Sequence, residues 1–284
     1  MQASLCSAMN IPMSNDDDSD TWGDSREINI HGPAEFAAMR KAGALAASIL
    51  DDMVEVVRIG LSTDEINTIC HDKIIAAGAV PAPLGYRGFP KSICTSVNHV
   101  VCHGIPDARK LVNGDMVNID VTVIVDGWHG DTSRTYWVGD VAVKAKRLTQ
   151  VTYEAMMQGI EVVRPGMKTG DIGHAIQTYA ESFGYSIVRE YCGHGLGKIF
   201  HTAPNILHFG KPNTGVTLEE GMFFTVEPMI NVGKAGTILN QKDGWTVTTR
   251  DKSLSAQFEH SIGVTANGFE IFTASAKGLH CPPF

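Results

Sequence analysis

The chain of 284 residues is long enough for a sizeable core, and its 43% hydrophobic and 19% charged residues are ordinary for a globular protein. Its net charge of −8 argues against DNA as a partner, because DNA-binding proteins usually carry a basic surface. The sequence has no apolar run of about 18 residues, so no membrane span is expected. A run of aspartates precedes the first basic residue, Arg26, so no secretory signal is expected either. Together these features predict a cytoplasmic protein.

The chain begins with a polar, acidic segment and then becomes periodic. Residues 1–26 show no hydrophobic period, which predicts a disordered tail before a single domain of residues 27–284. From Ala34, apolar residues recur at steps of three and four, which predicts a helix that Gly60 ends as a C-cap. A second helical pattern follows Thr63.

Two segments of the sequence occur twice, in the same order. VRIGLSTDEI (57–66) resembles VRPGMKTGDI (163–172), and LVNGDMVNID (111–120) resembles LEEGMFFTVE (218–227), at offsets of 106 and 107 residues. We infer an internal duplication in which each half has helices followed by strands that end in an acidic residue, Asp120 or Glu227. This predicts an α+β domain with approximate two-fold symmetry and a site between the halves.

A hairpin is predicted around Asp126-Gly127, a pair that suits a two-residue turn with positive φ. Counting back from that turn places Thr122 opposite Asp131. Asp131 then lies on the same face as Asp120, one diagonal step away, at roughly 7 Å. Two carboxylates at this distance repel each other, and a divalent cation would remove the repulsion. The alternative is a solvated polar face with two unrelated aspartates.

Two glutamates and a histidine complete the candidate set. Glu227 follows an apolar run, and Glu259 is predicted on one face of a strand with Gln257 and Ser261. A glutamate in an apolar strand is rarely left unpaired, so the alternative for each is a buried ion pair with an arginine. His194 lies in a glycine-rich segment that does not have the spacing of a phosphate-binding loop.

Four carboxylates and one imidazole form an oxygen-rich ligand set. Such a set favours manganese, ferrous iron or cobalt over zinc, and it can bind two divalent ions per chain. The sequence has neither the GxSxG motif of serine hydrolases nor an HExxH zinc helix. These residues therefore predict a two-metal hydrolase.

Seven segments resemble the type I methionine aminopeptidases, over about residues 30–275. They are SVNHVVCHGIP (96–106), NIDVTV (118–123), HGDTS (129–133), CGHGLGKIFH (192–201), FTVEPMI (224–230), KDGWTVTT (242–249) and SAQFEH (255–260). The resemblance implies the duplicated pita-bread fold, a curved antiparallel sheet flanked by helices with pseudo-two-fold symmetry. It also implies removal of the initiator methionine from nascent proteins when the second residue is small. The expected place of action is the ribosome, and the expected active form is a monomer.

The resemblance also assigns roles to individual residues. The implied metal ligands are Asp120, Asp131, His194, Glu227 and Glu259. Asp131 and Glu259 would bridge two ions, and Glu227 would also carry the proton from the attacking water to the leaving amine. His201 would contact the substrate carbonyl, and His103 the amide nitrogen of the scissile bond. The implied methionine pocket consists of Tyr86, Phe89, Cys94, Phe200 and Trp245.

The sequence departs from the family pattern around this pocket. Arg87 and Phe89 stand where relatives often have histidine and tyrosine, and Pro83 replaces a cysteine found in some. Type II relatives have a long insertion between the last two glutamates, for which the 32 residues from Glu227 to Glu259 leave no room. Two alternatives remain open, which are an Xaa-Pro peptidase on the same fold and a binding protein that has lost catalysis.

Overall fold

The computed structural model describes residues 27–284, so the expected disordered tail lies outside the described residues. The helices are α1 (Pro33–Val56), α2 (Thr63–Ala76), α3 (Val143–Glu161) and α4 (Thr169–Ser182), with a short 3-10 turn, η1 (Tyr86–Gly88). The strands are β1 (Val80–Pro81), β2 (Cys94–Val97), β3 (Val100–Cys102), β4 (Met116–Val125), β5 (Trp128–Trp137), β6 (Ser186–Ile187), β7 (Gly193–Gly195), β8 (Thr202–Ile206), β9 (Phe223–Val226), β10 (Met229–Asn231), β11 (Thr237–Leu239), β12 (Val247–Thr249), β13 (Ser255–Gln257), β14 (His260–Thr265) and β15 (Gly268–Ile271).

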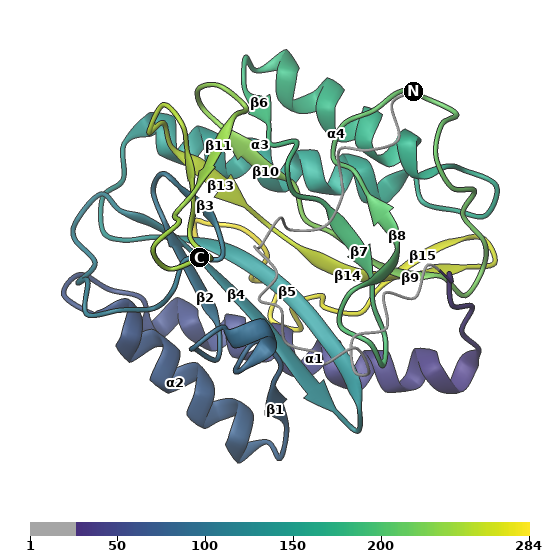
Figure 1. Cartoon of the computed structure of the whole chain (residues 1–284), viewed down its shortest axis with the longest axis horizontal. Helices are drawn as coiled ribbons and strands as arrows, with labels where there is room; N and C mark the ends of the chain where they lie inside the picture. Colours follow the sequence, from purple (N-terminus) through teal and green to yellow (C-terminus); the bar gives the residue numbers. More distant parts are fainter. Residues whose placement is uncertain (1–26) are drawn as a thin grey trace.

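The helices cover the strands from two sides. Helices α1 and α2 lie along one side of the strands, and α3 and α4 lie along the other (Figure 1). One core cluster joins α1 and α2 to β2 and β4, while another joins α3 and α4 to β9, β10 and β14. All strand pairs within residues 27–284 are antiparallel. The fold is therefore α+β with two related halves, as expected.

The starts of α2 and α4 show the duplication in atomic detail. The Ser62 backbone N–H donates to the Glu65 carboxylate at 2.8 Å, and the Lys168 N–H donates to Asp171 at 2.8 Å. Both acidic residues occupy the third position of their helix, where a carboxylate satisfies a backbone donor that has no partner within the helix. The repeated TDEI and TGDI segments therefore encode the same helix start.

The turn before each of these helices is also repeated. Gly60 donates a backbone hydrogen bond to Leu111 at 2.8 Å, and Gly166 donates to Leu218 at 2.9 Å. Gly60 has a φ of +88° and does not cap α1, because the helix already ends at Val56. The predicted C-cap was therefore wrong, and the glycine instead serves the turn between α1 and α2.

The hairpin β4–β5 has the predicted register. Thr122 lies opposite Asp131 and Val125 lies opposite Trp128, while Asp126 and Gly127 have φ values of +50° and +82°. Strands β1 and β2 both pair with the other edge of β4. The expectation of a strand that ends in an acidic residue was wrong in this half, because Asp120 lies in the middle of β4.

Both glutamates of the second half lie where the chain passes between two sheets. Glu227 separates β9 from β10, and Glu259 separates β13 from β14. Strand β10 pairs with β13, whereas β9 pairs with β14. The continuous strand expected around Glu259 is thus two strands, and Pro228, which has no N–H to donate, marks the break beside Glu227.

Candidate metal centre

Three side chains converge at the centre of the strands. Asp131, His194 and Glu259 are buried, and each offers a ligating atom within 4.8 Å of the other two. Asp131 comes from β5 and His194 from β7, and Glu259 comes from the break between β13 and β14. Residues from both halves therefore meet at one point, as the duplication predicted.

Glu227 and Asp120 lie next to this cluster. The His194 Nε2 atom lies 3.6 Å from Asp131 Oδ2 and 3.6 Å from Glu227 Oε1. Asp120 lies opposite Ser133, two positions along β5 from Asp131, so both aspartates project from the same face of the hairpin. The structure brings all five predicted ligands into one region, with Asp120 and Glu227 outside the tight group of three.

The electrostatics of the cluster show why it needs a cation. Burial, followed by the charge of Asp131, raises the pKa of Asp120 well above its usual value, and the same causes raise the pKa values of Glu227 and Glu259. Burial raises the pKa of Asp131 to about 7, against hydrogen bonds from Thr122 and Thr132. Within residues 27–284, no lysine or arginine pairs with any of these four carboxylates. The alternative of buried ion pairs with arginine is therefore not observed there.

The surroundings of His194 suit a metal ligand. Its Nδ1 lies 3.1 Å from the Gly195 carbonyl, so the N–H at Nδ1 donates there and leaves the Nε2 lone pair directed at the carboxylates. Burial lowers the pKa of His194 to about 4, which keeps the ring neutral near pH 7. A lone pair facing carboxylates is unfavourable without a cation between them, so these residues fit a divalent metal ion.

The packing of β7 between its neighbouring strands explains why glycines flank His194. A Cβ on Gly193 would lie 2.3 Å from the Thr225 carbonyl oxygen, and one on Gly195 would lie 2.1 Å from that of Ala203. Strand β7 therefore fits between β8 and β9 only with glycine at these positions. The expectation that they allow close approach to an ion stays a prediction.

Three residues that support Glu227 were missed from the sequence. Thr225 donates its hydroxyl to Glu227 Oε1 at 2.7 Å, and the Gln257 amide donates to Oε2 at 3.3 Å. The backbone N–H of Glu227 donates to Nε2 of His208, a fully buried residue, at 3.1 Å. His208 lies alone in an apolar run, and nothing in the sequence indicates its contact with Glu227.

His201 and two predicted pocket residues lie beside His194. The His201 ring centroid is 4.2 Å from that of His194 and 4.1 Å from that of Phe200. The Tyr86 hydroxyl lies 2.8 Å from His201 Nδ1, and burial raises the pKa of Tyr86 and lowers that of His201. The Tyr86 hydroxyl and Nδ1 of a neutral His201 are therefore hydrogen-bonded, and the direction of this bond is set by the imidazole tautomer.

His103 belongs to a second aromatic group. Its ring meets Trp245 edge-on at 6.1 Å, and Trp245 in turn meets Phe89 at 5.2 Å. His103 has a φ of +54°, a strained value that is common at functional sites, and burial lowers its pKa to about 4. Cys94 is buried opposite Asp120 across the β2–β4 ladder. Four of the five predicted pocket residues thus form two groups, Tyr86 and Phe200 around His201 and Phe89 and Trp245 around His103.

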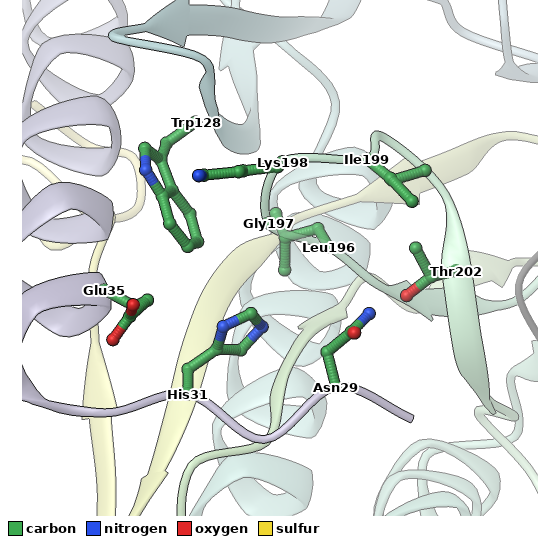
Figure 2. Close-up of a pocket in the computed structure, with 9 residues that line it drawn as sticks. All are labelled: Asn29, His31, Glu35, Trp128, Leu196, Gly197, Lys198, Ile199 and Thr202. Carbon is green, nitrogen blue, oxygen red and sulfur yellow. The ribbon is translucent and has the colours of Figure 1, made fainter. Parts of the chain in front are cut away.

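A cavity of about 250 Å³ lies next to the segment that follows His194. Figure 2 shows that Asn29 and His31 line it from one side and Trp128 and Lys198 from the other. No residue of the predicted site lines this cavity. Its wall is nevertheless connected to the site. The Gly197 carbonyl accepts hydrogen bonds from the backbone and the ring of His129, and that ring stacks on Phe200 at 5.3 Å.

None of the helices in residues 27–284 is both long and apolar enough to cross a membrane.

The fold and the buried acidic cluster define a metal-dependent hydrolase, and comparison with known proteins agrees. Residues 37–266 match the model of metallopeptidase family M24. A methionine aminopeptidase from Rickettsia prowazekii is 65% identical over 257 residues, which cover 90% of this chain and 99% of the relative. The crystal structure of methionine aminopeptidase from that organism has a TM-score of 0.87 and covers 87% of this chain and 100% of its own.

A methionine aminopeptidase from Escherichia coli K12 is 52% identical over 248 residues, covering 87% of this chain and 94% of the relative. The chain therefore belongs to the methionine aminopeptidases of metallopeptidase family M24. The resemblance inferred from the seven segments is confirmed. So is the prediction of a metal-dependent peptidase.

Proposed function

We propose that this protein removes the initiator methionine from polypeptides whose second residue is small (Gly, Ala, Ser, Thr, Pro or Val). The observation that carries the proposal is the buried cluster of Asp131, His194 and Glu259, which lies beside aromatic side chains suited to a methionine. The 65% identity to a methionine aminopeptidase supports the same reaction.

The donor set fits two divalent ions, with manganese, ferrous iron or cobalt favoured over zinc. Asp131 and Glu259 would bridge the ions; Asp120 would complete one site, and His194 with Glu227 the other. When bound, such ions lower the pKa of a water molecule to near neutral and polarise the scissile carbonyl. The raised pKa values of these carboxylates support this assignment, because bound cations offset their mutual repulsion.

Glu227 is suited to move a proton during the reaction. Hydrogen bonds from Thr225 and Gln257 orient its carboxylate, one on each oxygen. We assign to it the transfer of a proton from the attacking water to the leaving amine. His208, through the Glu227 backbone, fixes the chain segment from which this carboxylate projects.

His201 and His103 are suited to hold the substrate. We assign to the Tyr86 hydroxyl the donor role in its hydrogen bond with Nδ1 of His201, which would place an N–H at Nε2 for the carbonyl oxygen as negative charge develops there. His103 is assigned to the amide nitrogen of the scissile bond. Phe89, Trp245, Phe200, Tyr86 and Cys94 would form the apolar walls around the methionine side chain.

Steady-state kinetics on Met-Ala-Ser and Met-Lys-Ser test the proposed selectivity. We expect release of methionine from the first peptide and a kcat/KM lower by at least about tenfold for the second, because the proposed selectivity requires that a long second side chain be excluded from the site. Equal turnover of both peptides would contradict the selectivity. The enzyme should be chelated and then reloaded separately with Mn, Fe, Co or Zn, which identifies the ion that supports activity.

The same experiment separates the remaining alternatives. Hydrolysis of an Ala-Pro dipeptide in preference to Met-Ala-Ser would favour an Xaa-Pro peptidase, a class with the same fold. A chain that retains metal but hydrolyses neither peptide would instead be a binding protein.

A further inference from the structure

Strand β5, which carries Asp131, pairs with β4 along one edge, and within residues 27–284 no strand pairs with its other edge. An unpaired strand edge presents a row of backbone N–H and C=O groups, which need other partners when they are buried. Residues 257–261 of the second half, among them the candidate ligand Glu259, lie along this edge. The contact between β5 and residues 257–261, here called the inter-half interface, therefore lies at the candidate metal centre.

Two hydroxyl groups take the place of strand pairing at the inter-half interface. The Ser261 hydroxyl donates to the Asp131 carbonyl at 2.6 Å and accepts from the Asp131 N–H at 3.3 Å. The Thr135 hydroxyl makes the same two bonds to Gln257, donating to its carbonyl at 2.7 Å and accepting from its N–H at 3.4 Å. Each hydroxyl therefore satisfies both backbone groups of one residue in the opposite half.

A direct backbone bond lies midway between these two hydroxyl contacts. The Glu259 N–H donates to the Ser133 carbonyl at 3.1 Å. This bond lies two residues from Ser261 along one segment and two residues from Thr135 along the other. One bond alone would leave the two segments free to rotate about it, whereas contacts on both sides fix their spacing and their angle. Ser261 and Thr135 are 0% and 1% exposed, so solvent does not compete for either hydroxyl.

The inter-half interface sets the separation of the two candidate bridging carboxylates. Asp131 comes from β5 and Glu259 from the opposite segment, and each offers a ligating atom within 4.8 Å of the other. Two carboxylates can bridge a pair of ions only at a suitable separation, and hydrogen bonds behind the ligands hold that geometry. We propose that Ser261 and Thr135 are positioning residues, whose hydroxyl groups hold these two carboxylates at the spacing that a second ion requires. This inference rests on the proposed function, which assigns two ions to the site.

Substitutions that remove only a hydroxyl group test this role. Thr135→Val keeps the shape of the side chain without its hydroxyl, whereas Thr135→Ser keeps the hydroxyl and loses a methyl group. Ser261→Ala removes the other hydroxyl. Loss of a hydrogen bond behind a metal ligand lowers metal affinity by about 10- to 100-fold. We therefore expect Thr135→Val and Ser261→Ala to bind one of two manganese ions more weakly by about this factor, and Thr135→Ser to stay close to the wild type.

Two measurements on the chelated full-length protein report this loss. Titration calorimetry with Mn²⁺ gives the number of bound ions and the affinity of each. Electron paramagnetic resonance distinguishes two manganese ions that share bridging ligands, whose spins are coupled, from ions that are bound singly. We expect the coupled signal in the wild type and in Thr135→Ser. At the same manganese concentration, Thr135→Val and Ser261→Ala should show mainly the single-ion signal.

Tyr136→Phe is the matched control, because Tyr136 is a buried residue of β5 whose hydroxyl donates to the Leu50 carbonyl within the first half, at 2.6 Å. This variant should lose stability and keep both ions. Weaker binding of the second ion in Tyr136→Phe, or the same affinity in Thr135→Val and Thr135→Ser, would overturn the proposal. If Ser261→Ala does not fold, the two Thr135 variants decide.

The wild type separates a failure of this inference from a failure of the proposed function. A wild-type protein that shows no coupled pair of ions overturns the two-ion assignment, and the positioning role with it. A coupled pair that forms in the wild type and persists unchanged in Thr135→Val and Ser261→Ala rejects only the role of the two hydroxyl groups.

Discussion

At the scale of single residues, the metal ligands depend on neighbours that are not ligands. Asp131 accepts from Thr122 at 2.7 Å, and the Thr225 hydroxyl both accepts from the His194 backbone at 3.0 Å and donates to Glu227. Thr225 therefore connects a histidine of β7 with a carboxylate from the segment between β9 and β10. Such hydrogen bonds orient the ligands, and their loss typically lowers metal affinity or activity by about 10- to 100-fold.

His208 provides a test of this arrangement. Replacing it by alanine leaves the Glu227 N–H without its acceptor, which costs about 1–3 kcal/mol for a buried donor. We expect His208→Ala to lower kcat and metal content together. His208→Gln, whose side-chain oxygen can accept the same hydrogen bond, should recover part of both. Metal analysis with kinetics at fixed metal concentration gives the result, and equal loss in the two variants would indicate a packing role only.

The sequence contains much of the information about these residues, but not all of it. The relation between Asp120 and Asp131 follows from counting residues around one hairpin, because side chains alternate along strands. The meeting of those residues with His194, Glu227 and Glu259 depends on pairings between distant segments, for which the duplication and the family resemblance were needed. His208 could not have been found, since its contact with Glu227 joins two positions that share no local pattern.

At the scale of elements, α1 packs directly on the hairpin that carries both aspartates. A Cβ on Gly130 would lie 2.3 Å from the backbone of Ala42 in α1. Helix α1 also packs closely on the residue after β15, because a Cβ on Gly43 of this helix would lie 2.3 Å from the Phe272 carbonyl oxygen. The hairpin and the helix are thus in backbone contact one residue away from Asp131, so a change in their spacing acts on the site.

Gly130→Ala tests the effect of this spacing. The added methyl group must push α1 away from β5, and overpacking of this kind costs about 1–3 kcal/mol. For a protein of this size we expect the melting temperature to fall by about 3–10 °C, with weaker metal binding. Gly268→Ala is the matched control, because a Cβ there meets no atom within 4 Å. Thermal melts in which both variants behave alike would contradict the importance of the α1–β5 contact.

At the scale of the whole molecule, the duplication places the candidate site between two halves with separate cores. Asp120 and Asp131 belong to the first half, and His194, Glu227 and Glu259 belong to the second. A metal ion bound by all of them would link the halves. In its absence, the four buried carboxyl groups must either bind protons, as their raised pKa values indicate, or repel one another.

This arrangement predicts that removal of metal destabilises the protein more at pH 7.5 than at pH 5.5. The folded-state pKa of Asp131 without metal is about 7, above its usual value of 3.8. A carboxyl whose pKa is raised in the folded state does not affect stability below its unfolded-state pKa, because it is protonated in both states. The folded protein then loses stability as the pH rises, and the full loss is reached above the folded-state pKa. Metal binding also strengthens with pH, because the ligands must be deprotonated.

Thermal melts with and without a chelator at the two pH values measure this effect. With metal at about 100 times its dissociation constant, the stabilisation is about 2.7 kcal/mol, so we expect a shift of roughly 5–10 °C at pH 7.5 and a smaller shift at pH 5.5. Asp131→Asn should remove most of the difference between the two pH values, since the group that titrates near 7 and binds the ion is gone. Equal shifts at both pH values in the wild type would show that the buried carboxylates do not couple metal binding to the stability of the two halves.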